Sequence, residues 1–142
     1  MNDTLAFTQH DDVPPDAGAR VDEGLEESNQ AAAPLHDVRP LSCFARTPSG
    51  EVVGGAVGRT WGACCELQQL WVEPARRRRG LGAQLVRLFE AQAAARGCRV
   101  FYLETWSFQA PALYGALGYE VQARIDGFGP GLTKFLMLRQ LP

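Results

Sequence analysis

The chain has 142 residues, of which 46% are hydrophobic and 21% are charged, the size and composition of one globular domain. No apolar run approaches the ~20 residues that a membrane-spanning helix needs, and the acidic first residues do not resemble a secretory signal. Four cysteines without CxxC spacing argue against a disulfide framework, a zinc ribbon or another metal site. We therefore expect a cytoplasmic protein with no membrane partner.

The net charge of −2 is divided unevenly along the chain. Residues 1–37 hold nine acids against Arg20 alone, whereas residues 38–142 hold thirteen bases against seven acids. An acidic segment before a basic body is typical of a solvated helix, and it leaves open an anionic ligand for the body and a cationic one for the front. The arginine run at 76–79 is too short, in a protein of pI about 5.7, to indicate a nucleic-acid partner.

Periodicity and turn residues predict seven short strands and three helices. The strands are expected at 5–8, 35–47, 51–61, 64–72, 99–106, 119–125 and 133–141. The helices are expected from Pro14-Pro15-Asp16 onward, from Leu81 up to Gly97, and over 109–117. This order predicts an α/β (mixed α+β) fold: one mixed, mostly antiparallel sheet with helices on both faces.

Two of the strands carry further expectations. Simple alternation along 64–72 places Leu67, Gln69 and Trp71 on one face and the residues between them on the other. The strand at 99–106 is apolar on both faces, which is typical of a central strand.

The segment from Arg77 to Ala83 lies between the end of a strand and the start of a helix. The first N–H groups of a helix have no intrahelical partner and carry the positive end of the helix dipole. Gly80 and Gly82 let the backbone approach a ligand without a Cβ clash. The segment therefore predicts a site for a phosphate or pyrophosphate, although it matches neither a Walker A loop nor a complete GxGxxG motif.

The pattern Arg77-x-x-Gly80-x-Gly82, after a strand that ends in Trp71-Val72-Glu73-Pro74, resembles motif A of the GNAT superfamily of acetyl-CoA-dependent N-acetyltransferases. The segment 110–120, with an alanine, a tyrosine and then Leu-Gly-Tyr, looks like the second signature of that family. The resemblance covers about 50–142 and implies one N-acetyltransferase domain over 1–142. Its acidic front would be 1–37 and its acetyl-CoA-binding core 50–142.

The resemblance also implies cofactor contacts. Backbone groups of Leu70 and Val72, next to Trp71, would pair with the pantetheine arm as an added strand. The loop and helix start would hold the pyrophosphate, with Arg76 or Arg78 near the 3′-phosphate. Ser107 stands where the family often has a cofactor-contacting Asn, and is a weaker candidate. The cofactor-binding residues implied are Leu70, Trp71, Val72, Arg77, Arg78, Arg79, Gly80, Leu81, Gly82, Ala83, Ser107 and Tyr114.

The chemistry of amine acetylation needs a base and an acid. An alkyl ammonium must lose a proton before it attacks, and a departing thiolate benefits from a proton donor. The resemblance gives the donor role to Tyr114. For the base, Glu104 on the predicted central strand is preferred narrowly over Glu66, because a partly desolvated carboxylate has a raised pKa. Either acid is equally compatible with a structural ion pair.

For the acceptor, we predict a small cationic amine that attacks the thioester directly in a ternary complex. The acidic first helix, the loop 127–131 and the aromatic residues Trp61, Trp106 and Phe108 would flank it, since acids and aromatic rings attract cations. The alternatives are a protein lysine or N-terminal acetyltransferase and a non-catalytic acyl-CoA-binding module. A homodimer through the apolar run 135–138 is also expected, although burial within the chain explains that run equally well.

Overall fold

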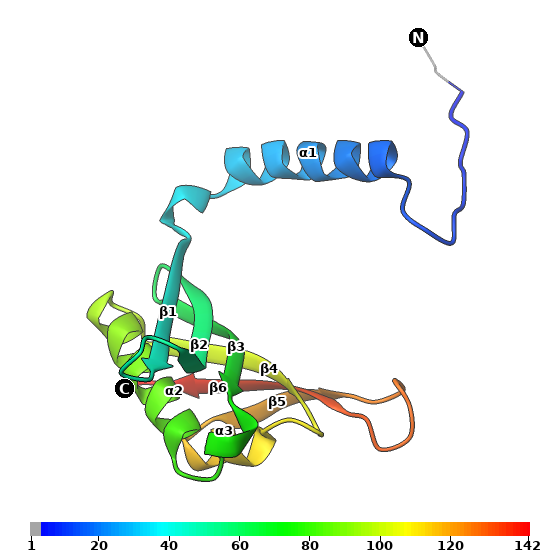
Figure 1. Ribbon diagram of the computed structural model, residues 1–142. Coiled ribbons are helices and arrows are strands. Elements are labelled where there is room, and N and C mark those ends of the chain that lie inside the picture. Colours follow the sequence, from blue (N-terminus) through cyan, green and yellow to red (C-terminus); the bar gives the residue numbers. More distant parts are fainter. Residues whose placement is uncertain (1–3) are drawn as a thin grey trace. The chain divides into compact units, whose positions relative to one another are not determined.

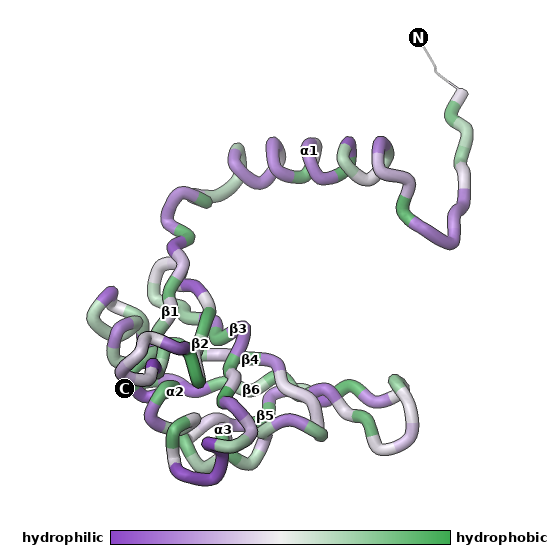
Figure 2. Tube along the Cα trace, viewed as in Figure 1, coloured by the Kyte–Doolittle hydropathy of each residue, from purple (hydrophilic) through white to green (hydrophobic). Residues whose placement is uncertain are grey.

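The computed structural model describes residues 4–142 of the chain (Figure 1). They form two compact units, one up to Leu35 and the other His36–Pro142, and each is described by itself. The first unit holds α1 (Pro15–Ala32), which begins at a proline, as predicted, and buries no residue. Figure 2 shows mostly hydrophilic residues along this helix.

The predicted strand at 5–8 is wrong. These residues have no regular secondary structure, and Leu5 and Phe7 are 73% and 90% exposed. A strand needs a neighbouring strand that pairs with its backbone N–H and C=O groups. Among residues 4–142 this segment has no such neighbour, and the sequence pattern alone could not reveal that. No helix among residues 4–142 is long and apolar enough to cross a membrane.

The second unit is built on one six-stranded sheet with the order β1-β2-β3-β4-β6-β5. β3 and β4 pair in parallel, and every other neighbouring pair is antiparallel. The expected α/β class, the mixed sheet and the central position of β4 are therefore confirmed. The strands are β1 (Arg39–Arg46), β2 (Val52–Trp61), β3 (Cys64–Val72), β4 (Val100–Trp106), β5 (Glu120–Ile125) and β6 (Lys134–Gln140).

Two helices of this unit, α2 (Leu81–Ala95) and α3 (Pro111–Ala116), contribute to a single hydrophobic cluster with the strands. α2 packs on β1, β2 and β3, and Gly97 follows it with a φ of +95°, as expected of a helix-ending glycine. Its buried apolar stripe is Leu85, Val86, Phe89 and Ala93. Because both helices contribute to the same cluster, their contacts do not show a helix on each face of the sheet. The prediction that helices cover both faces therefore stays a prediction.

A β-bulge interrupts the pairing of β2 with β3. Val57 pairs with Gln69 and Gly58 with Leu67, so Gln68 is the extra residue on β3. Leu67 is buried, and Leu70 packs against the same cluster. The predicted simple alternation along β3 is therefore wrong, because the extra residue reverses the two faces beyond it.

Gly58 is the partner that permits this bulge. A Cβ at this position would overlap the carbonyl oxygen of Glu66 and would lie 2.9 Å from Cζ of Phe89. The other edge of β3 is paired over only part of its length. Parallel pairing with β4 runs from Cys64 to Leu67 and stops there, so the last residues of β3 have no partner strand on that side. This is where the candidate site opens.

Candidate active site

A cavity of about 950 Å³ lies between the unpaired end of β3, the start of α2 and the segment from the end of β4 into α3. Most of the residues that the sequence marked as site candidates line it. They are Leu70, Trp71, Val72, Arg77, Arg78, Gly80, Leu81, Gly82, Ala83, Glu104 and Tyr114. Three candidates, Arg79, Ser107 and Glu66, are not among its lining residues.

The loop before α2 has the backbone of an anion site. Arg78 and Gly80 have φ angles of +63° and +79°, and a positive φ is uncommon for a residue with a side chain. Gly80 is the N-cap of α2, and no side chain caps the helix start. The N–H groups of the first helical turn therefore have no side-chain cap, and the phosphate site expected there stays a prediction.

Gly82 is in the first turn of α2, where the elements that form the cavity come together. A Cβ there would lie 3.4 Å from Leu113 on α3 and 3.9 Å from Val72 on β3, which is ordinary van der Waals contact.

The free edge of β3 carries backbone groups of known direction. The N–H of Glu73 donates to the carbonyl of Val53 on β2, at 2.8 Å. Because successive residues of a strand point their backbone groups to opposite sides, those of Leu70 and Val72 point away from β2. The carbonyl of Val72 accepts a hydrogen bond from Nε of Arg77, at 2.8 Å. The other groups on this edge remain available to an extended ligand.

The arginines of the loop have different tasks. Arg77 is held to the end of β3 by the bond to Val72, and Arg76 pairs with Glu73 at 3.0 Å. Arg78 lines the cavity without an ion pair among the described residues. Arg77 and Arg79 also have no acidic partner in residues 4–142, but Nε of Arg77 is used by Val72 and Arg79 does not line the cavity.

Tyr114 lines the cavity from α3 and is 7% exposed. Its hydroxyl has no hydrogen-bond partner within residues 4–142, yet it is not sealed from solvent. Burial raises the pKa of Tyr114 to about 12. The hydroxyl therefore keeps its proton at neutral pH, on a side chain that lines the cavity, although the raised pKa makes it a weaker acid than an ordinary tyrosine.

The two candidate bases lie in different surroundings. Glu104 lines the cavity, and its Oε2 lies 3.2 Å from Nζ of Lys134. Its side chain is 57% exposed, so the expected partial desolvation is not found. Glu66 lies outside the cavity lining and pairs with Arg59 across β2 and β3 at 3.0 Å. Only Glu104 of the two is placed to meet a ligand in this cavity.

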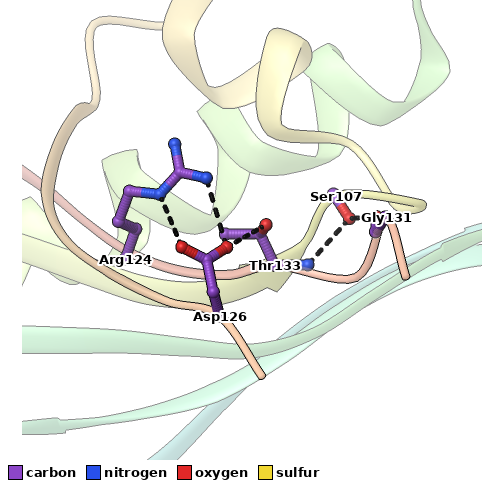
Figure 3. Close-up of polar contacts among 5 residues, drawn as sticks. All are labelled: Ser107, Arg124, Asp126, Gly131 and Thr133. Atoms are coloured by element: carbon purple, nitrogen blue, oxygen red, sulfur yellow. Dashed lines mark hydrogen bonds and ion pairs between the residues drawn. The ribbon is translucent and has the colours of Figure 1, made fainter. Parts of the chain in front are cut away.

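Ser107 has a structural use (Figure 3). Its hydroxyl donates to the carbonyl of Gly131 at 2.9 Å and accepts from the N–H of Thr133 at 3.1 Å. Asp126 continues this network: it accepts from the Thr133 hydroxyl at 2.7 Å and pairs with Arg124, and these contacts lower the pKa of its carboxyl. The network fastens the β5–β6 loop to the end of β4, which accounts for Ser107 without a cofactor.

The aromatic residues expected near the acceptor separate into two places. Phe108 lines the cavity and stacks on Trp106 with ring centroids 5.8 Å apart. Trp106 also meets the edge of Phe128 at 4.6 Å and carries Nζ of Lys134 over its ring at 5.2 Å. Trp61 pairs with Cys64 at the opposite end of β3, so its expected place beside the acceptor is wrong.

A buried polar group behind Tyr114 was not expected from the sequence. Glu90 of α2 is 7% exposed and accepts from the Tyr119 hydroxyl at 3.0 Å and from Arg139 at 2.7 Å. Burial and the nearby Glu90 carboxylate raise the pKa of Tyr119. The Tyr119 ring packs edge-on against Tyr114, with centroids 6.0 Å apart. The sequence signal for this buried group was the Glu90 carboxylate beside the apolar stripe of α2, because a buried charge needs a partner.

Comparisons with known proteins agree with this geometry. The profile of the Acetyltransferase (GNAT) family matches residues 7–119. A blasticidin-S acetyltransferase of Streptomyces morookaense is 37% identical over 112 residues, which cover 76% of this chain and 82% of that protein. An acetyltransferase of Agrobacterium fabrum is 29% identical over 126 residues, which cover 89% and 90% of the two chains.

Solved structures show the same fold. An acetyltransferase from Bacillus cereus has a TM-score of 0.81 at 23% identity, over 94% of this chain and 98% of that one. An aminoglycoside 6′-N-acetyltransferase in complex with coenzyme A has a TM-score of 0.66 at 18% identity, over 97% and 98%. At these identities, the likenesses concern the fold alone.

Proposed function

Because this chain belongs to the GNAT family of acetyltransferases, we propose that it transfers the acetyl group of acetyl-CoA to a primary amine of a small cationic molecule. The observation that carries the proposal is the protonated Tyr114 hydroxyl, which has no partner in residues 4–142 and lines a cavity shared with an uncapped helix start. The uncapped helix start would bind the pyrophosphate of an acyl-CoA, and the tyrosine hydroxyl would serve its thioester.

The residues present fit acetyl-CoA. The first turn of α2, with Gly80, Gly82 and Ala83, would bind the pyrophosphate through backbone N–H groups. Arg78 would add a charge for a phosphate. The free edge of β3 at Leu70 and Val72 would bind the peptide-like amides of the pantetheine arm, as an added strand does.

Acetyl-CoA supplies the acetyl group as a thioester: a C–N bond forms to the amine, the C–S bond breaks, the amine loses a proton and coenzyme A leaves as a thiol. Tyr114 would donate the proton that the sulfur takes up as the C–S bond breaks, and the proton released by the amine would restore the neutral tyrosine. Alignment of amine and thioester in one cavity supplies much of the rate.

Glu104 would take the amine proton, directly or through water. Its Oε2 faces Lys134, and its Oε1 has no partner among the described residues, so one oxygen is free to accept. Lys134 in turn lies over the Trp106 ring, which limits the movement of the pair. Glu66 is the weaker candidate because Arg59 holds it outside the cavity.

A small cationic acceptor is supported by two observations. The relative from Streptomyces morookaense is a blasticidin-S acetyltransferase and so acts on a small molecule. The lining of the cavity includes the Glu104 carboxylate and the aromatic side chains of Phe44, Trp71 and Phe108. A carboxylate and aromatic faces attract an organic cation.

The first experiment is thermal unfolding with and without excess acetyl-CoA. Ligand at about 100 times its dissociation constant adds ~2.7 kcal/mol of stability, so a clear rise of the midpoint is expected. A panel of nucleoside, aminoglycoside and polyamine amines is then scored by thiol release, with Tyr114→Phe as the variant. Turnover should fall about 100-fold while acetyl-CoA binding is kept. Absence of any stabilisation by acetyl-CoA would contradict the proposal.

A further inference from the structure

Gln109, which the sequence did not single out, lines the same cavity from the turn between β4 and α3. Its Oε1 accepts a hydrogen bond from the backbone N–H of Trp106 at 3.0 Å and from the Thr105 hydroxyl at 3.4 Å. A backbone N–H can only donate, so the atom that faces it must be the oxygen of the amide. The orientation of the Gln109 side chain is therefore fixed by the backbone, without the usual ambiguity of amide groups.

The nitrogen end of Gln109 is left with its donors unused. Nε2 carries two N–H groups, and neither has an acceptor within residues 4–142. Ser107 is the opposite case, because Gly131 and Thr133 use its hydroxyl both as donor and as acceptor. Of these two polar side chains, Gln109 has hydrogen-bonding capacity to spare and lines the cavity.

The place of Gln109 suggests what it binds. The cavity has the free edge of β3 on one side and the segment from Glu104 to Tyr114 on the other. An extended ligand bound along β3 by its amides turns further carbonyl oxygens towards the second wall. We infer that Gln109 is a cofactor-binding residue whose Nε2 donates a hydrogen bond to a carbonyl oxygen of the pantetheine arm. This inference rests on the proposed function.

The test measures dissociation constants by calorimetry for three probes: acetyl-CoA, coenzyme A, and adenosine 3′,5′-bisphosphate, which lacks the pantetheine arm. The main variant is Gln109→Glu, which keeps an oxygen for Trp106 and Thr105 and removes the donor. Gln122→Glu on the exposed strand β5 makes the same chemical change outside the cavity and serves as the matched control. Gln109→Met removes the donor without adding charge, and unfolding midpoints of the free variants report on folding.

The expected result is a loss of about 10-fold in affinity for both acetyl-CoA and coenzyme A in the two Gln109 variants, the size of one hydrogen bond. Affinity for the bisphosphate should stay within about 2-fold, as should all three affinities in Gln122→Glu. This pattern supports the inference, because only a contact to the arm affects both arm-containing probes and spares the third.

Four results overturn the inference. Unchanged affinities in both Gln109 variants would remove the contact, and an equal loss for all three probes would indicate a distorted site. A loss for acetyl-CoA alone would move the contact to the acetyl group. A loss in Ser107→Ala in place of the Gln109 variants would return the role to Ser107. If the unaltered protein binds neither acetyl-CoA nor coenzyme A, the proposed function itself fails, which is a distinct outcome.

Discussion

The two halves of β3 differ in every respect that matters for function. From Cys64 to Leu67 the strand has neighbours on both edges, and its inward residues are buried. From Gln68 to Val72 it has a neighbour only on the β2 side, and it lines the cavity. The bulge at Gln68 marks the boundary between the halves. One strand thus stabilises the fold with its first half and presents free backbone groups to a ligand with its second.

The cavity therefore lies where the pairing of β3 with β4 ends. Each half places one carboxylate candidate: Glu66 lies in the paired half, and Glu104 on β4 lies one residue beyond the last paired position, Leu103. Both acids have a cross-strand ion pair, Glu66 with Arg59 and Glu104 with Lys134, but only Glu104 lines the cavity. Position relative to the last β3–β4 pair, more than residue type or ion pairing, separates the two candidates.

The largest expected effect comes from adding a methyl group at Gly58, the residue of β2 next to the bulge. Gly58→Ala places a methyl group against the Glu66 carbonyl and the Phe89 ring. We expect the free energy of unfolding to fall by about 3 kcal/mol, measured by urea denaturation. Gly115→Ala is the control, because nothing lies within 4 Å of its added Cβ. A Gly58→Ala protein as stable as the unaltered chain would show that the bulge does not depend on glycine.

The next test exchanges the two carboxylates for amides. If Glu104 is the base, Glu104→Gln lowers kcat/KM at neutral pH by about 100-fold with little change in stability. Glu66→Gln breaks a half-exposed ion pair, whose contribution to stability is at most about 1 kcal/mol. A larger loss of activity in Glu66→Gln would reverse the assignment. Equal, small losses across pH would indicate that water accepts the proton.

A smaller effect is expected from a change at Glu90, the buried acid of α2. Glu90→Gln leaves Arg139 without a charged partner and weakens the bond from Tyr119. We expect the free energy of unfolding to fall by about 2 kcal/mol. A double-mutant cycle with Arg139→Gln isolates the pair, because the losses of interacting residues do not add. Fully additive losses would show that the pair contributes no coupling.

The smallest effect is a difference in alkaline stability. Burial raises the pKa of Tyr114 to about 12 in the folded chain, against ~10 when unfolded. The folded protein therefore keeps a proton that the unfolded chain loses, so stability is complete below pH ~10 and falls as the pH rises towards ~12. Between pH 8 and 11, the unaltered chain should lose about 1 kcal/mol more than Tyr114→Phe. Parallel pH curves for the two proteins would show that the hydroxyl is solvated.

Much of the fold could be predicted from local sequence. The bounds of β3 are as predicted, and α2 begins at Leu81 after its glycine, because turn residues, proline and helical periodicity act within a few positions. The strand expected at 35–47 begins at Arg39, since a short 3₁₀ helix over Leu35–Asp37 precedes it. The glycine before α2 was predicted for the same reason: a helix start without a side-chain cap is a local property of the backbone.

Short-range patterns in the sequence were therefore enough to predict the order of the elements from the first helix onward, the glycine-rich helix start and the family. Tertiary structure alone decided which residue of β3 is extra, which arginine or lysine each carboxylate meets, and that Ser107 is engaged while Gln109 has free donors. The physical reason is that bulges, ion pairs and hydrogen bonds depend on the register between segments far apart in the chain. Gln69 and Val57, or Glu90 and Arg139, are neighbours only after the sheet has formed.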